Sequence, residues 1–353
     1  MLTGSTTARW RISVVTVPRL SCSLSRLARI APAVREVNQA ASATAHRRNT
    51  LALAAHPEIG WAHMRVRVSD VRLYFDVAGM GLVPDGPVMR ERPVVLCLHG
   101  GPGFDHSTLK AYLTQLADDV QLVFLDHRGQ GRSDHSAPER WNLETWIDDV
   151  RGASDALGLE RPVILGQSFG GVVALGAAIR YPDLPSRLIV SSSIAKFRLD
   201  RALPMFERLG GERAREVAER YFRDPDQERL EAFIAICLPL YNTTPQDPDI
   251  ITRVIRRDEV ALHFFRGEAF TYDWLDQLER IRCPTLILAG ELDPITTVAD
   301  HEDMAARIPG SRLEVFPNTG HGVFRDQAAQ ALNLIKEFVL APTTPQAKAP
   351  HRD

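Results

Sequence analysis

The sequence contains few cysteines, and their spacing excludes the common cysteine-based sites. The chain of 353 residues has only Cys22, Cys97, Cys237 and Cys283, with no C-x-x-C pair among them. Cys97 and Cys283 stand in apolar runs, where a thiol usually behaves as a small buried hydrophobic group. The histidines also lack the spacing of a zinc site. We therefore expect reduced cysteines in a cytoplasmic protein, with no metal ion and no cofactor.

The sequence also lacks a strong net charge and a long apolar run. Its 42 basic and 44 acidic residues give a formal net charge of -2, so nothing favours binding to nucleic acid or to an anionic membrane surface. No run of about 18 apolar residues occurs, so we expect no membrane-spanning helix. The apolar content of 44% suffices to bury a large core, which predicts one large domain or a domain with an insertion.

Lysine is scarce, and the basic residues are unevenly placed. Residues 1–63 carry eight arginines, no lysine and only two acids, Glu36 and Glu58. Such an Arg-rich, acid-poor composition is typical of an organelle transit peptide. However, arginine dominates the whole chain, with 38 Arg against 4 Lys, as expected of a GC-rich genome, in which long spurious reading frames precede genes. Regular strand patterning also begins only after Met64. We therefore expect a natural start at or near Met64, with residues 1–63 disordered or absent from the working protein. The transit-peptide interpretation stays open.

From residue 64 onward, strand-like and helix-like segments alternate. Residues 65–69 and 72–77 alternate in period two across a Ser-Asp turn, which predicts an antiparallel hairpin followed by a Gly/Pro loop. Further strands are predicted by apolar runs at 94–98, 120–125, 163–165, 188–190, 285–288 and 312–316. Helices are predicted at 107–117, 143–157, 171–181, 298–308 and 324–340. This order predicts an α/β protein with a mostly parallel sheet and helices on both of its faces.

One long interval interrupts this alternation. About ninety residues separate the strand ending at Val190 from the strand beginning at Thr285, and they contain apolar stripes at helical spacing. One stripe includes Leu230 and Phe233, and a second is predicted to run through residues 251–265. We therefore predict a core at residues 64–193 and 281–340, a helical cap inserted at residues 194–280, and a disordered tail at residues 341–353.

A serine stands at a strand-to-helix junction, between glycines. Gly166-Gln167-Ser168-Phe169-Gly170 matches G-x-S-x-G, follows the run 163–165 and precedes a predicted helix. That context is the one in which the motif forms a nucleophile elbow, a strained turn that exposes the serine hydroxyl above the sheet. A Gly-rich turn with no catalytic role is the simpler alternative. Ser168 is therefore our candidate nucleophile.

A serine nucleophile needs a histidine base whose orientation is set by a carboxylate. In this topology the partners follow in the order Ser, acid, His, each on a loop after a later strand. Asp293 follows the run 285–288, and His321 follows the run 312–316. These two residues are therefore the candidate acid and base. Glu291 is a rival for the acid.

Acyl transfer also requires two backbone N–H groups that face the developing oxyanion. One is expected from Phe169, the residue after the nucleophile, and the other from the loop His99-Gly100-Gly101-Pro102-Gly103. Because proline has no N–H, Gly101 is the preferred second donor, with Gly100 as the alternative. We expect the ring of His99 to order this loop by hydrogen bonding.

These motifs together resemble the α/β-hydrolase superfamily. The resemblance rests on HGGPG at residues 99–103, on DHRGQGRS at residues 126–133, on the Ser168 elbow and on the Asp293 and His321 loops. The first two motifs are similar to those of the proline iminopeptidase branch, and the resemblance covers nearly all of residues 64–340. It implies that cap glutamates bind the substrate's free amino terminus. Glu268 is the first candidate for this role, with Glu207 and Glu259 as others.

The elbow departs from the pattern of that branch, which usually reads G-G-S-W-G-S. Gln167, Phe169 and Gly171 replace its Gly, Trp and Ser. We therefore expect a serine hydrolase that acts on a small molecule or a short peptide, with proline iminopeptidase activity as the first hypothesis. Carboxylesterase or lactonase activity is the alternative, and a non-catalytic ligand receptor is a third hypothesis.

Overall fold

The computed structural model describes residues 64–342. The extension predicted at residues 1–63 lies outside the described residues, and so does nearly all of the tail predicted at 341–353. Within the described part of the chain, no helix combines the length and the apolar character needed to cross a bilayer.

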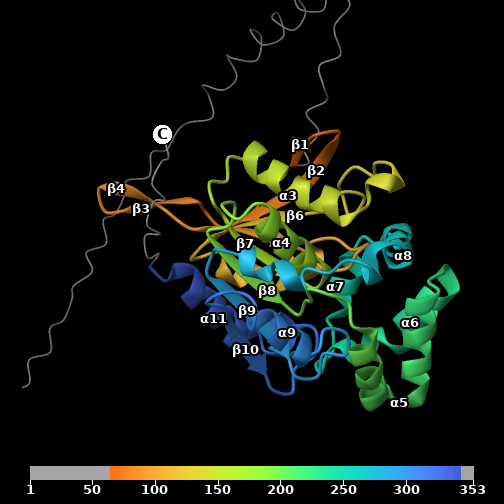
Figure 1. The fold of residues 1–353 in the computed structure, drawn as a ribbon. Coiled ribbons are helices and arrows are strands. Elements are labelled where there is room, and N and C mark those ends of the chain that lie inside the picture. The colour runs from red at the N-terminus through yellow and green to blue at the C-terminus, as the bar shows by residue number, and fades with distance from the viewer. Residues whose placement is uncertain (1–63, 343–353) are drawn as a thin grey trace, which may run out of the picture. The chain divides into compact units, whose positions relative to one another are not determined.

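An eight-stranded sheet forms the centre of the described chain (Figure 1). Its order is β1-β2-β6-β5-β7-β8-β9-β10. The strands are β1 (Arg65–Val68), β2 (Val71–Ala78), β5 (Val94–Leu98), β6 (Gln121–Leu125), β7 (Val163–Gln167), β8 (Arg187–Ser191), β9 (Thr285–Gly290) and β10 (Arg312–Phe316). Strand β2 pairs antiparallel with both β1 and β6, and all other neighbours are parallel. The predicted mostly parallel sheet, opened by an antiparallel hairpin, is therefore confirmed.

Burial explains why the strand signals differ in strength. All residues of β8 and β9 are buried, so both strands appear in the sequence as continuous apolar runs. Strand β10 lies at the edge of the sheet, where only Phe316 is buried. Exposed positions accept polar residues, which is why this run is less uniform.

Helices cover both faces of the sheet. Helices α2 (Ser107–Leu113), α10 (Val323–Asp326) and α11 (Ala328–Leu340) contribute to the apolar cluster on one face. Helices α3 (Leu143–Ala156), α4 (Phe169–Arg180) and α9 (Val298–Ala305) contribute to the cluster on the other. Short 3-10 helices, η2 (Thr114–Leu116) and η3 (Pro138–Arg140), complete the connections.

The predicted Gly/Pro loop after β2 is wrong, because this segment forms a second hairpin. Strands β3 (Leu82–Asp85) and β4 (Val88–Glu91) pair antiparallel around Gly86 and Pro87, with Gly86 at a φ of 60°. Every residue of β4 is exposed, and the hairpin projects from the central sheet (Figure 1). Val83 is the one buried residue of the two strands, which is too little for an apolar alternation, so the pattern in the sequence did not reveal them.

Between β8 and β9, the regular elements of the described chain are helices, and one isolated bridge joins Lys196 to Asp273. The elements are α5 (Leu199–Arg223), α6 (Gln227–Ile236), η4 (Leu238–Tyr241), α7 (Pro248–Arg253), α8 (Asp258–Arg266), η5 (Glu268–Phe270) and η6 (Leu275–Arg280). A separate apolar cluster lies among them and includes Phe206, Phe222 and Phe233. We call residues 194–280 the cap segment; its separation from the core as a domain stays a prediction.

The predicted second stripe of the cap segment is not one helix. Helix α7 ends at Arg253 and α8 begins at Asp258. Between them, the backbone N–H of Arg257 donates a 2.7 Å hydrogen bond to the carbonyl of Gly103 in the core. This long-range bond replaces the intrahelical bond that a continuous helix would need. Within α7, Ile251 of the predicted stripe is 57% exposed, whereas its neighbour Ile250 is buried.

Candidate active site

Ser168 lies in a strained turn between β7 and α4. Its backbone has a φ of 53° and a ψ of -122°, a region that non-glycine residues rarely occupy. The flanking glycines are required by close backbone contacts. A Cβ atom at Gly166 would lie 2.3 Å from the carbonyl oxygen of Gly170, and one at Gly170 would lie 2.2 Å from that of Leu98. The turn therefore has the geometry expected of a nucleophile elbow.

Two hydrogen bonds to the backbone of Ser168 hold this turn in place. The N–H of Ser168 donates to the carbonyl of Ser191 at 3.0 Å, and the hydroxyl of Ser193 donates to the carbonyl of Ser168 at 2.7 Å. Both serines come from the end of β8 and the loop that follows it. The hydroxyl of Ser168 itself has no hydrogen-bond partner among residues 64–342.

Asp293 and His321 are brought together by the loops after β9 and β10. The ring Nδ1 of His321 lies 2.8 Å from Oδ2 of Asp293, and Asp293 is fully buried. The N–H and the hydroxyl of Thr296 also donate to this carboxylate, at 2.9 and 2.6 Å. Burial alone raises the pKa of Asp293, but His321 and the hydrogen bonds of Thr296 outweigh it, so the pKa lies below its usual value. Asp293 is therefore an anion that orients His321.

The rival acid, Glu291, has a different contact. Its Oε2 accepts a 2.9 Å hydrogen bond from the N–H of Asn318, and the residue is exposed. Glu291 thus connects the loop after β9 with the loop after β10, and the carboxylate that contacts His321 is that of Asp293.

Ser168 and His321 follow strands of the same parallel sheet and lie at its carboxyl edge, but no hydrogen bond joins them. In unliganded enzymes, contacts between a catalytic nucleophile and its base are often long and shorten when substrate binds. The structure therefore contains the acid–base pair in contact, with the serine held separately in its elbow.

The loop at residues 99–103 lies against the serine, as an oxyanion loop must. A Cβ atom at Gly100 would lie 3.2 Å from Cβ of Ser168. Gly101 has a φ of 130°, a conformation that favours glycine. Phe169 is the first residue of α4, so its N–H is one of the four at a helix start that lack an intrahelical acceptor. Gly101 and Phe169 remain our proposed oxyanion donors.

The ring of His99 orders this loop, as predicted. Its Nδ1 lies 2.7 Å from the carbonyl oxygen of Gly100, and its Nε2 lies 3.2 Å from the backbone N–H of His127. An Nε2 that accepts from an N–H leaves the proton on Nδ1, where it can be donated to Gly100. Burial lowers the pKa of His99, which keeps the ring in this neutral form.

Two residues have supporting contacts that the sequence analysis did not assign to them. Oε1 of Gln130 accepts a 2.7 Å hydrogen bond from the N–H of Gly103. Asp326 accepts from the N–H of Gly320 at 2.9 Å and from the hydroxyl of Thr244 at 2.6 Å, so it links the His321 loop to the cap segment. The contacts of Gln130 with Gly103 and of Asp326 with Thr244 join segments that are 27 and 82 residues apart, and a single sequence has no local signal for them.

Glu268, the candidate for binding a substrate amine, contacts the core. Its Oε2 accepts a 2.7 Å hydrogen bond from the N–H of Leu143 at the start of α3. A carboxylate at a helix N-terminus stabilises that helix. Its other oxygen, Oε1, has no hydrogen bond within the described residues. Of the other two candidates, Glu207 forms an exposed ion pair with Arg215, and Glu259 lines a cavity on α8.

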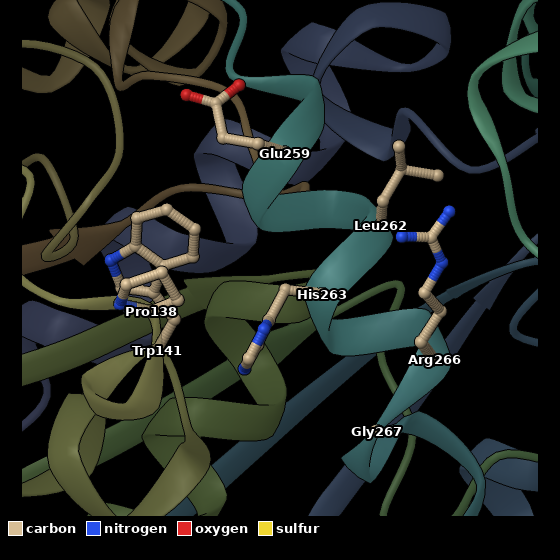
Figure 2. A pocket seen from close by; sticks show the side chains of 7 residues that line it. All are labelled: Pro138, Trp141, Glu259, Leu262, His263, Arg266 and Gly267. Carbon is tan, nitrogen blue, oxygen red and sulfur yellow. The ribbon is translucent and has the colours of Figure 1, made fainter.

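This first cavity lies along α8 and has a volume of about 520 Å³. Figure 2 shows Glu259, Leu262, His263 and Arg266 projecting from the helix, with Trp141 opposite. The rings of Trp141 and His263 are 5.8 Å apart in an edge-on arrangement. None of the residues that line this cavity belongs to the Ser168, Asp293 and His321 set.

The side chain of Phe169 fills the space behind the elbow. Its ring lies 5.0 Å from that of Trp146 in the core and 5.2 Å from that of Phe264 on α8, both edge-on. Phe169 is 4% exposed. The residue that departs from the expected tryptophan therefore packs the cap segment against the elbow.

One cluster has the donor types of a metal site. Asp105, His106 and Asp126 are buried, with ligand atoms within 4.8 Å of one another. However, Asp126 accepts from Nδ1 of His106 at 2.6 Å, and Asp105 pairs with Arg132 at 2.6 Å. Both carboxylates already have hydrogen-bond or ion-pair partners within the chain, so the cluster is best described as support for the loops after β5 and β6.

The strand order, the Ser168 elbow and the Asp293–His321 pair together indicate one protein family. The family described as "alpha/beta hydrolase fold" matches residues 93–328, which is more than half of the chain. The chain belongs to the α/β-hydrolase family. This confirms the predicted fold, and the protein is a hydrolase.

The proteins that this hydrolase resembles include proline iminopeptidases and an esterase. A proline iminopeptidase from Lactobacillus helveticus is 28% identical over 272 residues, which are 70% of this chain and 90% of the relative. A proline iminopeptidase from Mycobacterium smegmatis has a TM-score of 0.65 at 22% identity, covering 79% of this chain and 97% of that one. An esterase from Thermogutta terrifontis has a TM-score of 0.59 at 27% identity, covering 79% and 98%. The predicted resemblance to proline iminopeptidases is therefore confirmed, with an esterase at similar structural distance.

Proposed function

We propose that the protein is a serine hydrolase that uses Ser168, His321 and Asp293 as a catalytic triad, with N-terminal proline aminopeptidase activity as the leading hypothesis. The observation that carries the proposal is the combination of a strained serine elbow with a buried carboxylate 2.8 Å from the histidine ring. The first of these exposes a nucleophile, and the second orients its base.

In the proposed reaction, the hydroxyl of Ser168 attacks the substrate carbonyl while Nε2 of His321 takes its proton. The N–H groups of Phe169 and Gly101 stabilise the oxyanion of the tetrahedral intermediate. His321 then gives the proton to the leaving group, and an acyl-enzyme remains. A water molecule, activated by His321, repeats these steps and releases the acid. Asp293 stays ionised and stabilises the protonated ring of His321.

Substrate recognition is proposed to involve Glu268 through its free oxygen Oε1. A carboxylate facing a substrate ammonium in a partly dry pocket binds more strongly than in water. If Glu268 binds the amine, Glu268→Gln raises KM for L-proline β-naphthylamide and leaves KM for p-nitrophenyl butyrate unchanged. Equal effects on both substrates would instead show that the carboxylate acts only by holding α3.

A carboxylesterase or lactonase is the second candidate. It is favoured by the apolar packing around Phe169, by the contact of Glu268 with α3 and by the similarity to the Thermogutta terrifontis esterase. The test is a panel of aminoacyl β-naphthylamides, p-nitrophenyl esters and lactones. Release of naphthylamine from the prolyl substrate supports the peptidase, and cleavage of esters alone contradicts it.

The third hypothesis is that the protein is a non-catalytic receptor with this fold. It is tested with a fluorophosphonate probe, which labels only an activated serine. Labelling of the wild-type chain that disappears in Ser168→Ala supports the hydrolase. No labelling of the wild type would support the receptor.

The cytoplasmic location proposed for the enzyme is compatible with Cys97, Cys237 and Cys283, which are buried free thiols.

A further inference from the structure

A second cavity lies outside the proposed catalytic residues, where the core loop 131–135 meets the cap segment. Its volume is about 560 Å³. Arginine is the main charged residue type in its wall, which contains Arg65 from β1, Arg132 from the core loop and Arg257 from the cap segment. The wall also includes the apolar side chain of Ile255, the exposed ring of His135 and one acid, Asp134.

The side chain of Arg257 has donors without acceptors. Its Nε is buried and has no hydrogen-bond partner, and the structure of residues 64–342 contains no ion pair of this guanidinium. Its backbone is nevertheless held, because its N–H bonds to the carbonyl of Gly103 at 2.7 Å. Its two Nη groups likewise have no hydrogen-bond partner within residues 64–342, so they remain available to an acceptor supplied from outside the chain.

The other charged groups leave the cavity positive. The carboxylate of Asp134 is already occupied by Arg72, which contacts it through its backbone N–H, its Nε and its Nη2 at 2.9 to 3.2 Å. Arg132 uses Nη1 for Asp105 at 2.6 Å, and Arg65 uses Nη2 for the carbonyl of Arg132 at 2.8 Å. Each of these guanidinium groups has five N–H donors, so each keeps further donors for a ligand.

We propose that this cavity binds a phosphate group, either as inorganic phosphate or as part of a phosphomonoester. Three guanidinium groups on different elements suit an anion with several equivalent oxygens, and guanidinium matches phosphate in two-point hydrogen bonding. A carboxylate offers only two oxygens and would leave donors unpaired. The volume exceeds that of phosphate, which leaves space for an organic substituent against Ile255.

A bound phosphate would connect the cap segment to the core. Arg257 belongs to the cap segment, whereas Arg65 and Arg132 belong to the core. A ligand that binds only the folded state stabilises it by mass action. Phosphate is therefore expected to raise the melting temperature of the chain in a saturable way.

The test measures phosphate binding to the full-length chain by titration calorimetry, with chloride used to keep the ionic strength constant because screening weakens such contacts. We expect saturable binding and a Kd that rises at least tenfold in Arg257→Gln. Arg256→Gln is the matched control, because Arg256 is exposed, pairs with Asp258 and does not line the cavity. Its Kd is expected to equal that of the wild type.

A second pair of variants keeps the proposal testable if Arg257→Gln does not fold. Arg65→Gln is expected to weaken binding, whereas Arg67→Gln, an exposed neighbour on β1 outside the cavity, is not. If the ligand is a phosphomonoester, glycerol 3-phosphate is expected to bind with a lower Kd than inorganic phosphate. Absence of saturable phosphate binding, equal binding of acetate, or unchanged binding in both Arg257→Gln and Arg65→Gln would overturn the proposal. Binding is measured without turnover, so its failure is separate from failure of the proposed hydrolase activity.

Discussion

At the scale of single residues, Ser168 carries the main prediction. Its hydroxyl oxygen is the only protein atom in the proposed mechanism that bonds to the carbonyl carbon of the substrate. Ser168→Ala is therefore expected to lower kcat by roughly 10⁴- to 10⁶-fold on whichever substrate of the panel is cleaved. Steady-state kinetics checks this, and an unchanged melting temperature shows that the variant is folded. Activity within tenfold of wild type would rule out Ser168 as the nucleophile.

Asp293 and Glu291 form a matched pair of acids on one loop. Asp293→Asn removes the charge that stabilises protonated His321, and we expect kcat to fall by roughly 10⁴-fold. Glu291→Gln keeps the size of an exposed side chain that contacts Asn318, and we expect kcat to stay within about threefold of wild type. Kinetic measurement of both variants decides between the acids. A larger loss in Glu291→Gln would contradict the assignment.

At the scale of elements, the cap segment supports the loop that carries His321. The N–H of His321 donates to the carbonyl of Tyr241 at 2.5 Å, and Asp326 bonds to both Gly320 and Thr244. The ring of Tyr241 also lies edge-on to that of His321, at 4.9 Å. The position of His321 is therefore set jointly by the loop after β10 and by the end of η4.

Asp326→Ala tests this arrangement. It leaves the N–H of Gly320 without its acceptor, so the His321 loop is expected to shift, and small displacements of a catalytic group can cost about 10²-fold in rate. We expect kcat to fall by about that factor with little change in KM, and Asp326→Asn to retain part of the activity. Glu337→Ala, an exposed change on α11, is the control. A loss of melting temperature with unchanged kcat would show a purely structural role.

At the scale of the whole molecule, three buried histidines make stability depend on pH. Burial lowers the pKa of His99 and His301, and lowers that of His127 well below its usual value. In the unfolded chain a histidine titrates near pH 6.5. Below this pH the unfolded state binds more protons than the folded state, so the free energy of unfolding decreases as pH falls.

The pH dependence of stability is tested at His127, whose pKa burial lowers well below its usual value. Each proton that the unfolded chain binds in excess of the folded chain changes the free energy of unfolding by about 1.4 kcal/mol per pH unit. His127→Leu is therefore expected to reduce the slope between about pH 6.5 and 5.5 by up to this amount, measured by denaturant unfolding. Leu125→Ala, another buried change, should lower stability by about 2 to 5 kcal/mol without altering the slope. An unchanged slope in His127→Leu would contradict the prediction.

The sequence by itself determined the elements with strong local signals. Buried parallel strands appear as continuous apolar runs, and the serine elbow requires glycines at Gly166 and Gly170 because their backbones touch other chain segments. Strand order then places the loops that carry Asp293 and His321 at one edge of the sheet. Exposed strands such as β4 have no such signal, and the sequence did not predict them.

Only the tertiary structure decided which carboxylates have which partners. It places Asp293 and not Glu291 against His321, it directs Glu268 to the start of α3, and it brings Arg65, Arg132 and Arg257 into one cavity. The physical reason is the same in each case. A hydrogen bond or a charged cavity depends on distances of a few ångströms between residues far apart in the chain, and those distances exist only after the sheet and the cap segment have packed.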